Sequence, residues 1–419
     1  MKRIFGFLAL SLLACQPARP QGVAVVDAPS SPSADVCASI NRALQGLRYG
    51  GTVDARNLVG TVTCASDMFA GVTPDATTAN ERAFTVLLGP ATFLTRVPQS
   101  QPRNVAVRGV WGGGTGSSAD PQWAGTKFKL DDPNRAGMTL WQLRNAHNAI
   151  LDGVSFDCVL APGCVGIRIF STGTYGAWRN RIENITIAHA AEGIRIGTGD
   201  AGCGSNGTAS CDASGLIIRN GTIREGRDQF DARGRQTEAS TGIWIEGANA
   251  AQGSIIESIL FQNLHTGIMV RRMEQGLRIS SIDCGNGRGA NSTCIYVGDV
   301  QNLVVTGSRN ELDEQNNDPT YRFMRVNSPS KIFSLVLEAN LFNGSRQPDG
   351  SYLAVDINTP ASIVSIGNGG AGLARTLGSN VEVTSVGDRF PYVGNRATNF
   401  SGWVDAAGTN RIRRLEALP

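Results

Sequence analysis

The sequence predicts an all-β solenoid, in which short strands stack coil upon coil along one axis. A five-residue pattern returns along the middle of the chain as Val165-Gly-Ile-Arg-Ile169, Glu192-Gly-Ile-Arg-Ile196, Thr241-Gly-Ile-Trp-Ile245, Thr266-Gly-Ile-Met-Val270 and Thr293-Cys-Ile-Tyr-Val297. An apolar run precedes each copy: Leu151–Phe156, Ile182–Ile187, Ile217–Ile223, Ile255–Phe261 and Leu277–Ile282. Alternation every second residue is the period of a strand, and units of roughly 25–50 residues must stack because one unit cannot bury its apolar face alone.

The composition fits this prediction and limits the partners of the protein. Glycine accounts for 51 of 419 residues and charged residues for 17%, against typical shares of about 7% and 25%, as expected for a β-rich chain with many tight corners. The formal net charge is only +3, so no nucleic-acid partner is expected. Of the 38 basic residues, all but four are arginines. A codon-biased genome would produce this excess, and recognition of carboxylates by the planar guanidinium group is the functional alternative.

The N-terminus has the features of an export signal. Two of the first three residues are basic, Ile4–Leu13 is apolar, and a small residue precedes Cys15. The segment resembles a bacterial lipoprotein signal, which implies a signal peptide over residues 1–14, lipid on the thiol of Cys15 and a flexible tether over residues 15–34. Ordinary secretion is the alternative. The apolar run is too short to cross a bilayer, so contact with a membrane is expected only through a lipid anchor.

Eight further cysteines form four close couples in the sequence. Eight cysteines allow 105 connectivities, and proximity alone favours the disulfides Cys37/Cys64, Cys158/Cys164, Cys203/Cys211 and Cys284/Cys294. The compartment that an export signal implies permits such bonds. A metal site is the alternative, but it is disfavoured because no Cys-x-x-Cys spacing occurs.

One long domain is expected over residues 35–419, with caps at about 35–60 and 390–419 that cover the open ends of the solenoid. Helical spacing of apolar residues predicts a capping helix over Ala38–Leu47. Strands are expected over Thr52–Ala55, Thr85–Leu88, Asn104–Val110 and Thr126–Leu130, and coils from about 145 to 388. A set of polar residues falls at an equivalent place in successive coils, where a bend with a structural role is expected: Asn184, Asn220, Ser258 and Ser281.

The start of this domain resembles that of a known superfamily. Ser39-Ile-Asn-Arg-Ala-Leu-Gln45, Gly51-Thr-Val-Asp-Ala55 and Leu87-Leu-Gly-Pro-Ala-Thr-Phe93, followed by Gly-Ile-x-Ile coils, are similar to pectate-lyase-type domains. The resemblance implies a single-stranded right-handed parallel β-helix with an N-terminal capping helix. It implies little about activity, since this fold is found in lyases, hydrolases, epimerases, phage tailspikes and non-catalytic surface proteins. It also leaves a homotrimer open.

The middle residue of each Gly-Ile-x-Ile copy is expected to point outward, because its aliphatic neighbours point into the core. With coils about 4.8 Å apart, these residues should form a row on one face: Arg168, Arg195, Trp244, Met269 and Tyr296, continued by Arg325 and Asp356. A second row should contain Phe170, Gly197, Glu246 and Arg271. The other sheet should present a polar, solvated face of Ser155, Thr186, Thr222, Leu260 and Asp283.

A row of aromatic and arginine side chains suits a polysaccharide. Pyranose rings stack on Trp or Tyr, while arginines bind hydroxyl or carboxylate groups. The candidate sugar-binding residues are therefore Arg168, Trp244, Met269 and Tyr296. The alternative is that loops fold over this face and bury Trp244 and Met269 in a satellite core.

Cleavage of the polysaccharide by β-elimination or by hydrolysis is open. Elimination needs a base near the C5 proton of a uronate and a cation beside its carboxylate. Arg195 and Arg271 beside Glu246 are the candidates, with Asp228 and Asp231 of a nearby loop as carboxylates that could hold Ca²⁺. Hydrolysis needs two carboxyl groups, so Glu246 would need a partner from a loop, for which Asp228, Asp231 and Asp200 are the candidates. The arginines favour a lyase acting on an acidic polysaccharide, and a non-catalytic glycan-binding adhesin is a third alternative.

Overall fold

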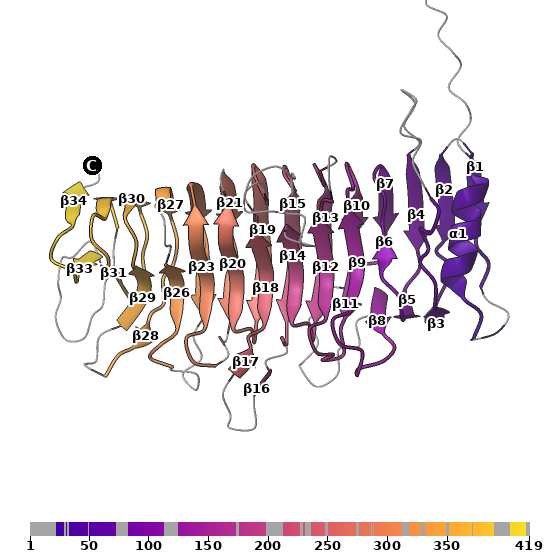
Figure 1. Ribbon diagram of the computed structural model, residues 1–419, viewed down its shortest axis with the longest axis horizontal. Coiled ribbons are helices and arrows are strands. Elements are labelled where there is room, and N and C mark those ends of the chain that lie inside the picture. Colours follow the sequence, from indigo (N-terminus) through magenta and orange to yellow (C-terminus); the bar gives the residue numbers. More distant parts are fainter. Residues whose placement is uncertain are drawn as a thin grey trace, which may run out of the picture.

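The computed structural model shows a right-handed parallel β-helix, elongated along the axis on which its coils stack (Figure 1). It describes residues 22–28, 31, 33–48, 50–72, 83–112, 125–172, 176–197, 213–226, 229–230, 236–247, 250–273, 276–285, 287, 289–311, 318–327, 332–348, 352–370, 372–388 and 403–415. The predicted all-β fold class is confirmed.

Two long parallel sheets form the walls of the solenoid. The 12-stranded sheet contains β6 (Gln99–Ser100), β9 (Thr139–Arg144), β12 (Val165–Phe170), β14 (Glu192–Gly197), β18 (Thr241–Glu246), β20 (Thr266–Met273), β23 (Thr293–Val300), β26 (Arg322–Val326), β29 (Tyr352–Ile357), β31 (Leu373–Thr376) and β33 (Trp403–Asp405), with β28 (Ser345–Arg346) antiparallel beside β29. A short antiparallel pair, β16 (Gln229–Phe230) and β17 (Gln236–Glu238), lies off both sheets.

The 20-stranded sheet bends around the rest of each coil. Its strands are β1 (Gly22–Val25), β2 (Gly51–Ala55), β3 (Gly60–Cys64), β4 (Phe84–Leu88), β5 (Ala91–Thr95), β7 (Val105–Arg108), β8 (Thr126–Leu130), β10 (Ile150–Asp152), β11 (Val154–Asp157), β13 (Arg181–Ala188), β15 (Ile217–Arg224), β19 (Ser254–Gln262), β21 (Leu277–Ser280), β22 (Asp283–Gly285), β24 (Asn302–Thr306), β25 (Arg309–Glu311), β27 (Ile332–Glu338), β30 (Ala361–Ile366), β32 (Glu382–Val386) and β34 (Arg411–Leu415).

The Gly-Ile-x-Ile pattern places its aliphatic residues in the core, as predicted. In β18, Ile243 and Ile245 are buried, while Trp244 between them is half-buried. The glycine is required by the close approach of neighbouring coils, because a Cβ atom at Gly242 would lie 2.5 Å from the carbonyl oxygen of Gly267. The repeated pattern therefore encodes both the inward face of the strand and the spacing between coils.

The polar residues at the bend of each coil adopt the left-handed backbone conformation. The φ angles of Asn184, Asn220, Ser258 and Ser281 are 53°, 54°, 55° and 52°, and the strand register stacks these residues above one another. Among L-residues, asparagine tolerates this conformation best. Their structural role is therefore confirmed.

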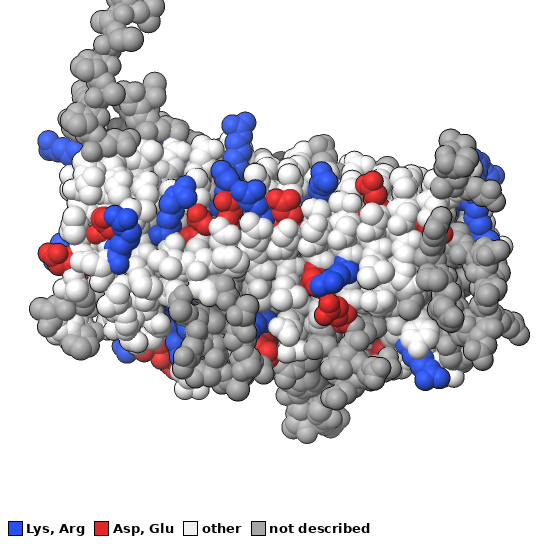
Figure 2. Space-filling model, turned by 180° about the vertical axis from the view of Figure 1, so that it is seen from behind, with Lys and Arg blue, Asp and Glu red and all other residues white. Residues whose placement is uncertain are grey.

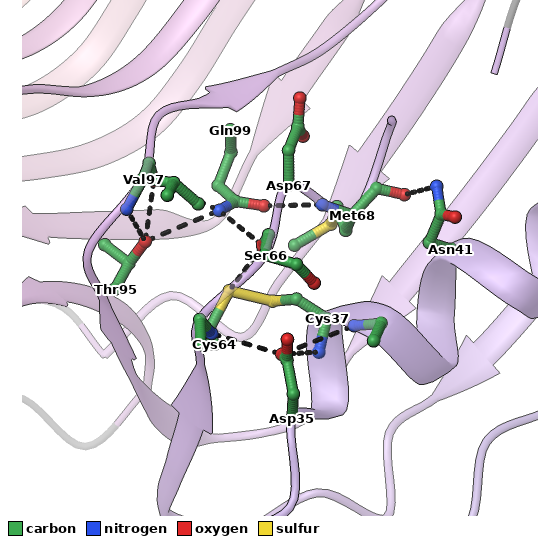
Figure 3. Close-up of a disulfide and its surroundings, with 12 residues drawn as sticks. Asp35, Cys37, Asn41, Cys64, Ser66, Asp67, Met68, Thr95, Val97 and Gln99 are labelled. Carbon is green, nitrogen blue, oxygen red and sulfur yellow. Dashed lines mark hydrogen bonds between the residues drawn. A yellow bond between two sulfur atoms is a disulfide. The ribbon is translucent and has the colours of Figure 1, made fainter. Parts of the chain in front are cut away.

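Helix α1 (Val36–Gly46) closes the N-terminal end of the solenoid (Figure 1). The carboxylate of Asp35 accepts hydrogen bonds from the N–H groups of Cys37 and Ala38 at 3.1 and 3.3 Å, and from that of Ala65 at 3.1 Å. A disulfide between Cys37 and Cys64 fastens the helix to β3 (Figure 3). The helix confirms the predicted cap, although it begins two residues earlier than the spacing predicts.

Both ends of the chain add strands where other structure was expected. Gly22–Val25, part of the expected tether, pairs with β2 as strand β1. At the other end, β33 pairs with β31 and β34 pairs with β32, all in parallel. The described part of the expected C-terminal cap is therefore a last coil of the solenoid, because its apolar residues continue the strand alternation; Trp403, for example, is 1% exposed.

Three of the four predicted disulfides are present: Cys37–Cys64, Cys158–Cys164 and Cys284–Cys294. The last two each close a loop within one coil. Cys15, Cys203 and Cys211 lie outside the described residues. Among the residues that the structure describes, no helix is both long and apolar enough to span a membrane.

Candidate functional site

The predicted outward row runs along the 12-stranded sheet in one register. Parallel pairing joins Arg168, Arg195, Trp244, Met269 and Tyr296 on successive strands from β12 to β23. The register continues to Arg325, Asp356 and Arg375 on β26, β29 and β31, and begins one strand earlier at Gln142 on β9. We call these nine residues, from Gln142 to Arg375, the ladder.

Every ladder residue is half-buried. Trp244 and Met269 are therefore not enclosed in a satellite core, but each packs against its neighbours and keeps part of its surface in solvent. The ladder is a continuous surface on which side chains from neighbouring coils contact one another.

Trp244 lies between two arginines near the middle of the ladder. The guanidinium carbons of Arg195, from the coil before, and Arg271, from the coil after, lie 5.2 and 5.6 Å from the centre of its ring. The indole Nε1 donates a hydrogen bond to Oε2 of Glu246 at 3.0 Å. Arg195 also forms an ion pair with Glu192 at 2.9 Å, and Arg271 approaches Glu246 at 3.7 Å. We call these five residues the tryptophan cluster.

The contacts of the tryptophan cluster limit what its members can do. Cations from both neighbouring coils lie over the indole ring, so Trp244 presents little open ring face for a sugar. A guanidinium group is a cation with N–H donors and no acceptor, and each of these two arginines lies beside a carboxylate. Arg195 and Arg271 therefore suit neutralisation of a substrate carboxylate better than removal of a proton.

The second row differs from the predicted one at Arg271. A shift of register after Ile245 places Arg272, and not Arg271, opposite Glu246. Arg272 in turn lies beside Asp299 on β23. Arg271 reaches Glu246 only through its long side chain. The sequence alone could not show this shift, because both adjacent residues are arginines.

A second group of charged side chains lies further along the ladder, and the sequence did not single it out as a site. Asp356 accepts hydrogen bonds from Nε of Arg322 at 2.7 Å and from Nε of Arg375 at 2.6 Å. Arg322 is 5% exposed and also donates to backbone oxygens of neighbouring residues. Arg325 lies in the ladder between Tyr296 and Asp356. We call Arg322, Arg325, Asp356 and Arg375 the arginine cluster.

Arg325 differs from the other two arginines of this cluster in its partners. It donates to Oδ1 of Asn291 at 3.2 Å and to the carbonyl oxygen of Thr320. Its Nε is buried without a hydrogen-bond partner in the described part of the chain. Burial and the nearby charge of Arg322 lower the pKa of Arg325, although Asp356 partly offsets them.

The opposite face of the solenoid is more enclosed than predicted. Ser155 and Thr186, expected in solvent, are 3% and 1% exposed. Elsewhere on the 20-stranded sheet, ion pairs link neighbouring coils, such as Arg219 to Glu183 at 2.9 Å. Figure 2, seen from behind, shows basic and acidic side chains gathered side by side in a band. The prediction of a solvated face was therefore wrong for Ser155 and Thr186. The alternation of a strand shows which side chains point away from the core, but it does not show whether other residues cover them.

Asp200, Asp228 and Asp231 lie outside the described residues, so their place relative to Glu246 stays a prediction. Within the described ranges, no group of three or more His, Cys, Asp or Glu side chains is arranged to hold a metal ion. The Ca²⁺ prediction is therefore untested.

Comparison with solved structures found 19 chains that match. The Agl-KA catalytic domain has a TM-score of 0.52 and 12% identity, covering 95% of this chain and 69% of its own. PfbA, a surface adhesin of Streptococcus pneumoniae, has a TM-score of 0.50 and 11% identity, covering 94% and 91%. An alginate lyase from Paenibacillus sp. str. FPU-7 has a TM-score of 0.43 and 15% identity, covering 74% and 94%.

The similarity is one of fold. No protein-family model matches the sequence, and a search of curated proteins found no match. The Agl-KA catalytic domain and PfbA, with TM-scores of 0.52 and 0.50, support the fold alone at these identities, and activity has to be argued from the ladder itself.

Proposed function

We propose that the protein is exported and binds an acidic polysaccharide along the ladder, which it cleaves by β-elimination. The observation that supports this most is the single register of the ladder over nine strands. With coils about 4.8 Å apart, this surface is roughly 40 Å long. An extended row of arginine and aromatic side chains of that length suits a linear polymer better than a small molecule.

The charges on the strands of the ladder favour an acidic polymer. From β9 to β31, leaving β28 aside, these strands contain eight arginines and four carboxylates: Arg144, Arg168, Arg195, Arg271, Arg272, Arg322, Arg325, Arg375, Glu192, Glu246, Asp299 and Asp356. Arginine binds carboxylates in a planar, two-pronged geometry. The excess of arginine is therefore complementary to a chain of uronic acids.

The same charges favour elimination over hydrolysis. In β-elimination a base removes the C5 proton, the bond from C4 to the glycosidic oxygen breaks, a C4–C5 double bond forms, and the departing oxygen takes up a proton. A cation beside the uronate carboxylate stabilises the intermediate carbanion, a role open to Arg195 and Arg271. Hydrolysis needs two carboxyl groups about the bond, whereas Glu246 and Asp356 are each held by an arginine.

Export and anchoring complete the proposal. The three disulfides are typical of an oxidising compartment outside the cytoplasm. The N-terminal sequence supports lipid attachment at Cys15, with secretion without an anchor as the alternative. Either route brings the ladder to polysaccharides outside the cell.

A panel of uronic-acid polysaccharides tests the reaction. Elimination produces an unsaturated uronate that absorbs ultraviolet light, so absorbance should rise with time. Release of reducing ends without this absorbance would replace the lyase by a hydrolase. Binding of a polysaccharide without absorbance and without new reducing ends would favour a glycan-binding adhesin. The contacts within the tryptophan cluster are compatible with binding alone. No binding to any member of the panel would overturn the proposal.

A further inference from the structure

We propose that Arg325 is the centre of an anion-binding subsite on the ladder, which takes the carboxylate or sulfate group of one sugar residue. The polymer to which that sugar belongs rests on the function proposed above. The subsite itself is a property of the arginine cluster and can be tested without a polymer.

The carboxylate of Asp356, which follows Arg325 on the ladder, is already bound by two other arginines. The two oxygens of Asp356 accept hydrogen bonds from Arg322 and Arg375. Arg322 is buried and is also bound by the backbone oxygens of Pro319 and Tyr321. Asp356 is therefore the one carboxylate bound directly by these arginines among the described residues, and Asp318 acts on Arg325 only by its charge. Three arginines against these two carboxylates leave an excess of positive charge.

Arg325 has only neutral hydrogen-bond partners in the described part of the chain, although the charges of Asp356 and Asp318 act on it from nearby. Among the described residues it forms no ion pair, and its hydrogen bonds go to the amide oxygen of Asn291 and the carbonyl oxygen of Thr320. A guanidinium group has five N–H donors. Two are used by these bonds and the Nε donor is buried, so two N–H groups of the terminal nitrogens have no partner among the described residues and can serve a ligand.

Arg325 lies on the ladder, where a bound polymer would pass. It is half-buried in register with Tyr296 on one side and Asp356 on the other. A ligand on the ladder would thus reach the guanidinium tip beside an aromatic ring. A half-buried cation with neutral partners gains more from an incoming anion than a solvated one, because the surrounding dielectric is lower.

Small sugars test this subsite directly. The melting temperature of the full-length protein is measured against increasing galacturonate, galactose 6-sulfate and galactose. Ligands that bind the native state raise the melting temperature, so both anionic sugars should do so and galactose should not. Arg325→Gln should need about tenfold more of either anion for the same shift, as expected for the loss of a charged hydrogen bond.

Arg278→Gln is the matched control, because it removes one exposed arginine from β21 of the other sheet. It should respond to the anionic sugars as the wild type does. Arg325→Lys, which keeps the charge and loses the fork, should lie between the wild type and Arg325→Gln, and it serves as the test variant if the glutamine variant does not fold. Equal responses of the wild type and the Arg325 variants, or an equal effect of galactose, would overturn the subsite.

The result separates this inference from the proposed function. Anion binding that depends on Arg325, without binding of any polysaccharide, would leave the subsite standing and remove the proposed function. Polysaccharide binding that is unchanged by Arg325→Gln would leave the proposed function standing and remove the subsite.

Discussion

The indole N–H of Trp244 donates a hydrogen bond of 3.0 Å to the carboxylate of Glu246, two residues further along the same strand. Residues two apart on a strand share a face, so this bond lies within the outer face of β18. It holds Glu246 where the guanidinium group of Arg271 also approaches it. The residue predicted to stack on a sugar thus positions a residue predicted to take part in the chemistry.

Trp244→Phe and Trp244→Ala separate the hydrogen bond from the ring. The phenylalanine variant keeps an aromatic ring but loses the N–H donor and the five-membered ring of the indole, so its free energy of unfolding should fall by about 1 kcal/mol or more. The alanine variant also loses the contacts of Arg195 and Arg271 with the ring, and should fall by about 1 kcal/mol more. Both variants should stay folded, since Trp244 lies outside the core, and both should bind polysaccharide more weakly. Urea unfolding and affinity electrophoresis measure the two effects, and an unfolded alanine variant would contradict this account.

The repeat made the fold and the ladder predictable from the sequence. Alternation assigns Ile243 and Ile245 to the core and Trp244 to the surface without further information, because a strand has a period of two. The same rule could not show the partners of Trp244. Both Arg195 and Arg271 reach it by side-chain conformations, and the register shift after Ile245 has no mark in the sequence.

The arginine cluster was harder to find for a related reason. Its strands lack the Gly-Ile pair, so Arg325 and Asp356 could be placed in the row but not matched to partners. Arg322 stands where the repeat has valine, glutamate or threonine, and its burial follows from contacts across coils. A strand pattern contains no information on such contacts.

The disulfides should contribute unequally to stability. Cys37–Cys64 closes a segment with a sequence separation of 27, and Cys158–Cys164 one with a separation of 6. In the chain-entropy account, loss of the longer link costs about 3–4 kcal/mol and loss of the shorter one about 2 kcal/mol. Urea unfolding of the double variants Cys37→Ser/Cys64→Ser and Cys158→Ser/Cys164→Ser compares them. The order would be reversed if the N-terminal cap did not unfold together with the coils.

The surroundings of Cys37–Cys64 sharpen this prediction (Figure 3). The buried side chain of Gln99 accepts a hydrogen bond from the N–H of Met68 at 2.9 Å and donates to the carbonyl oxygen of Ser66 at 3.1 Å. These bonds hold the chain just after Cys64 independently of the disulfide. Gln99→Leu in the disulfide-free variant should therefore cause a further loss of about 1–3 kcal/mol, whereas a change near zero would show that this segment is already released.

The buried Asp157 on the 20-stranded sheet and the half-buried His189 beside it should make stability depend on pH. Oδ1 of Asp157 lies 2.9 Å from Nδ1 of His189 and also accepts the N–H of Val159 at 2.9 Å. Burial by itself raises the pKa of Asp157, but these hydrogen bonds outweigh it, and the pKa lies below the ordinary value of 3.8. A carboxyl group with a lowered native pKa stabilises the fold above its unfolded pKa and loses this effect as pH falls through the native pKa.

Asp157→Asn tests this dependence. At pH 7 the wild type should be more stable than the variant by about 1–3 kcal/mol. The difference should shrink as pH falls below about 4. Urea unfolding at a series of pH values between 7 and 2 gives the curve. A difference that does not change with pH would mean that Asp157 acts through its shape alone.

The left-handed residues at the bends of successive coils give a pair of opposite predictions. Ala339 has a φ of 51° and lies between Gly307 at 59° and Gly367 at 60°, and each of these three residues donates its N–H to the coil that follows. A left-handed residue other than glycine costs about 1–2 kcal/mol, while glycine adds about 0.5–1 kcal/mol of unfolded-state entropy. Ala339→Gly should therefore stabilise the protein by about 0.5–1 kcal/mol.

Asn220→Ala, at the equivalent bend with a φ of 54°, should destabilise the protein by about 1 kcal/mol, because the amide side chain that tolerates this conformation is lost. Thermal unfolding of both variants measures the two changes, and equal signs would show that side-chain contacts, and not the backbone conformation, decide the stability of these bends.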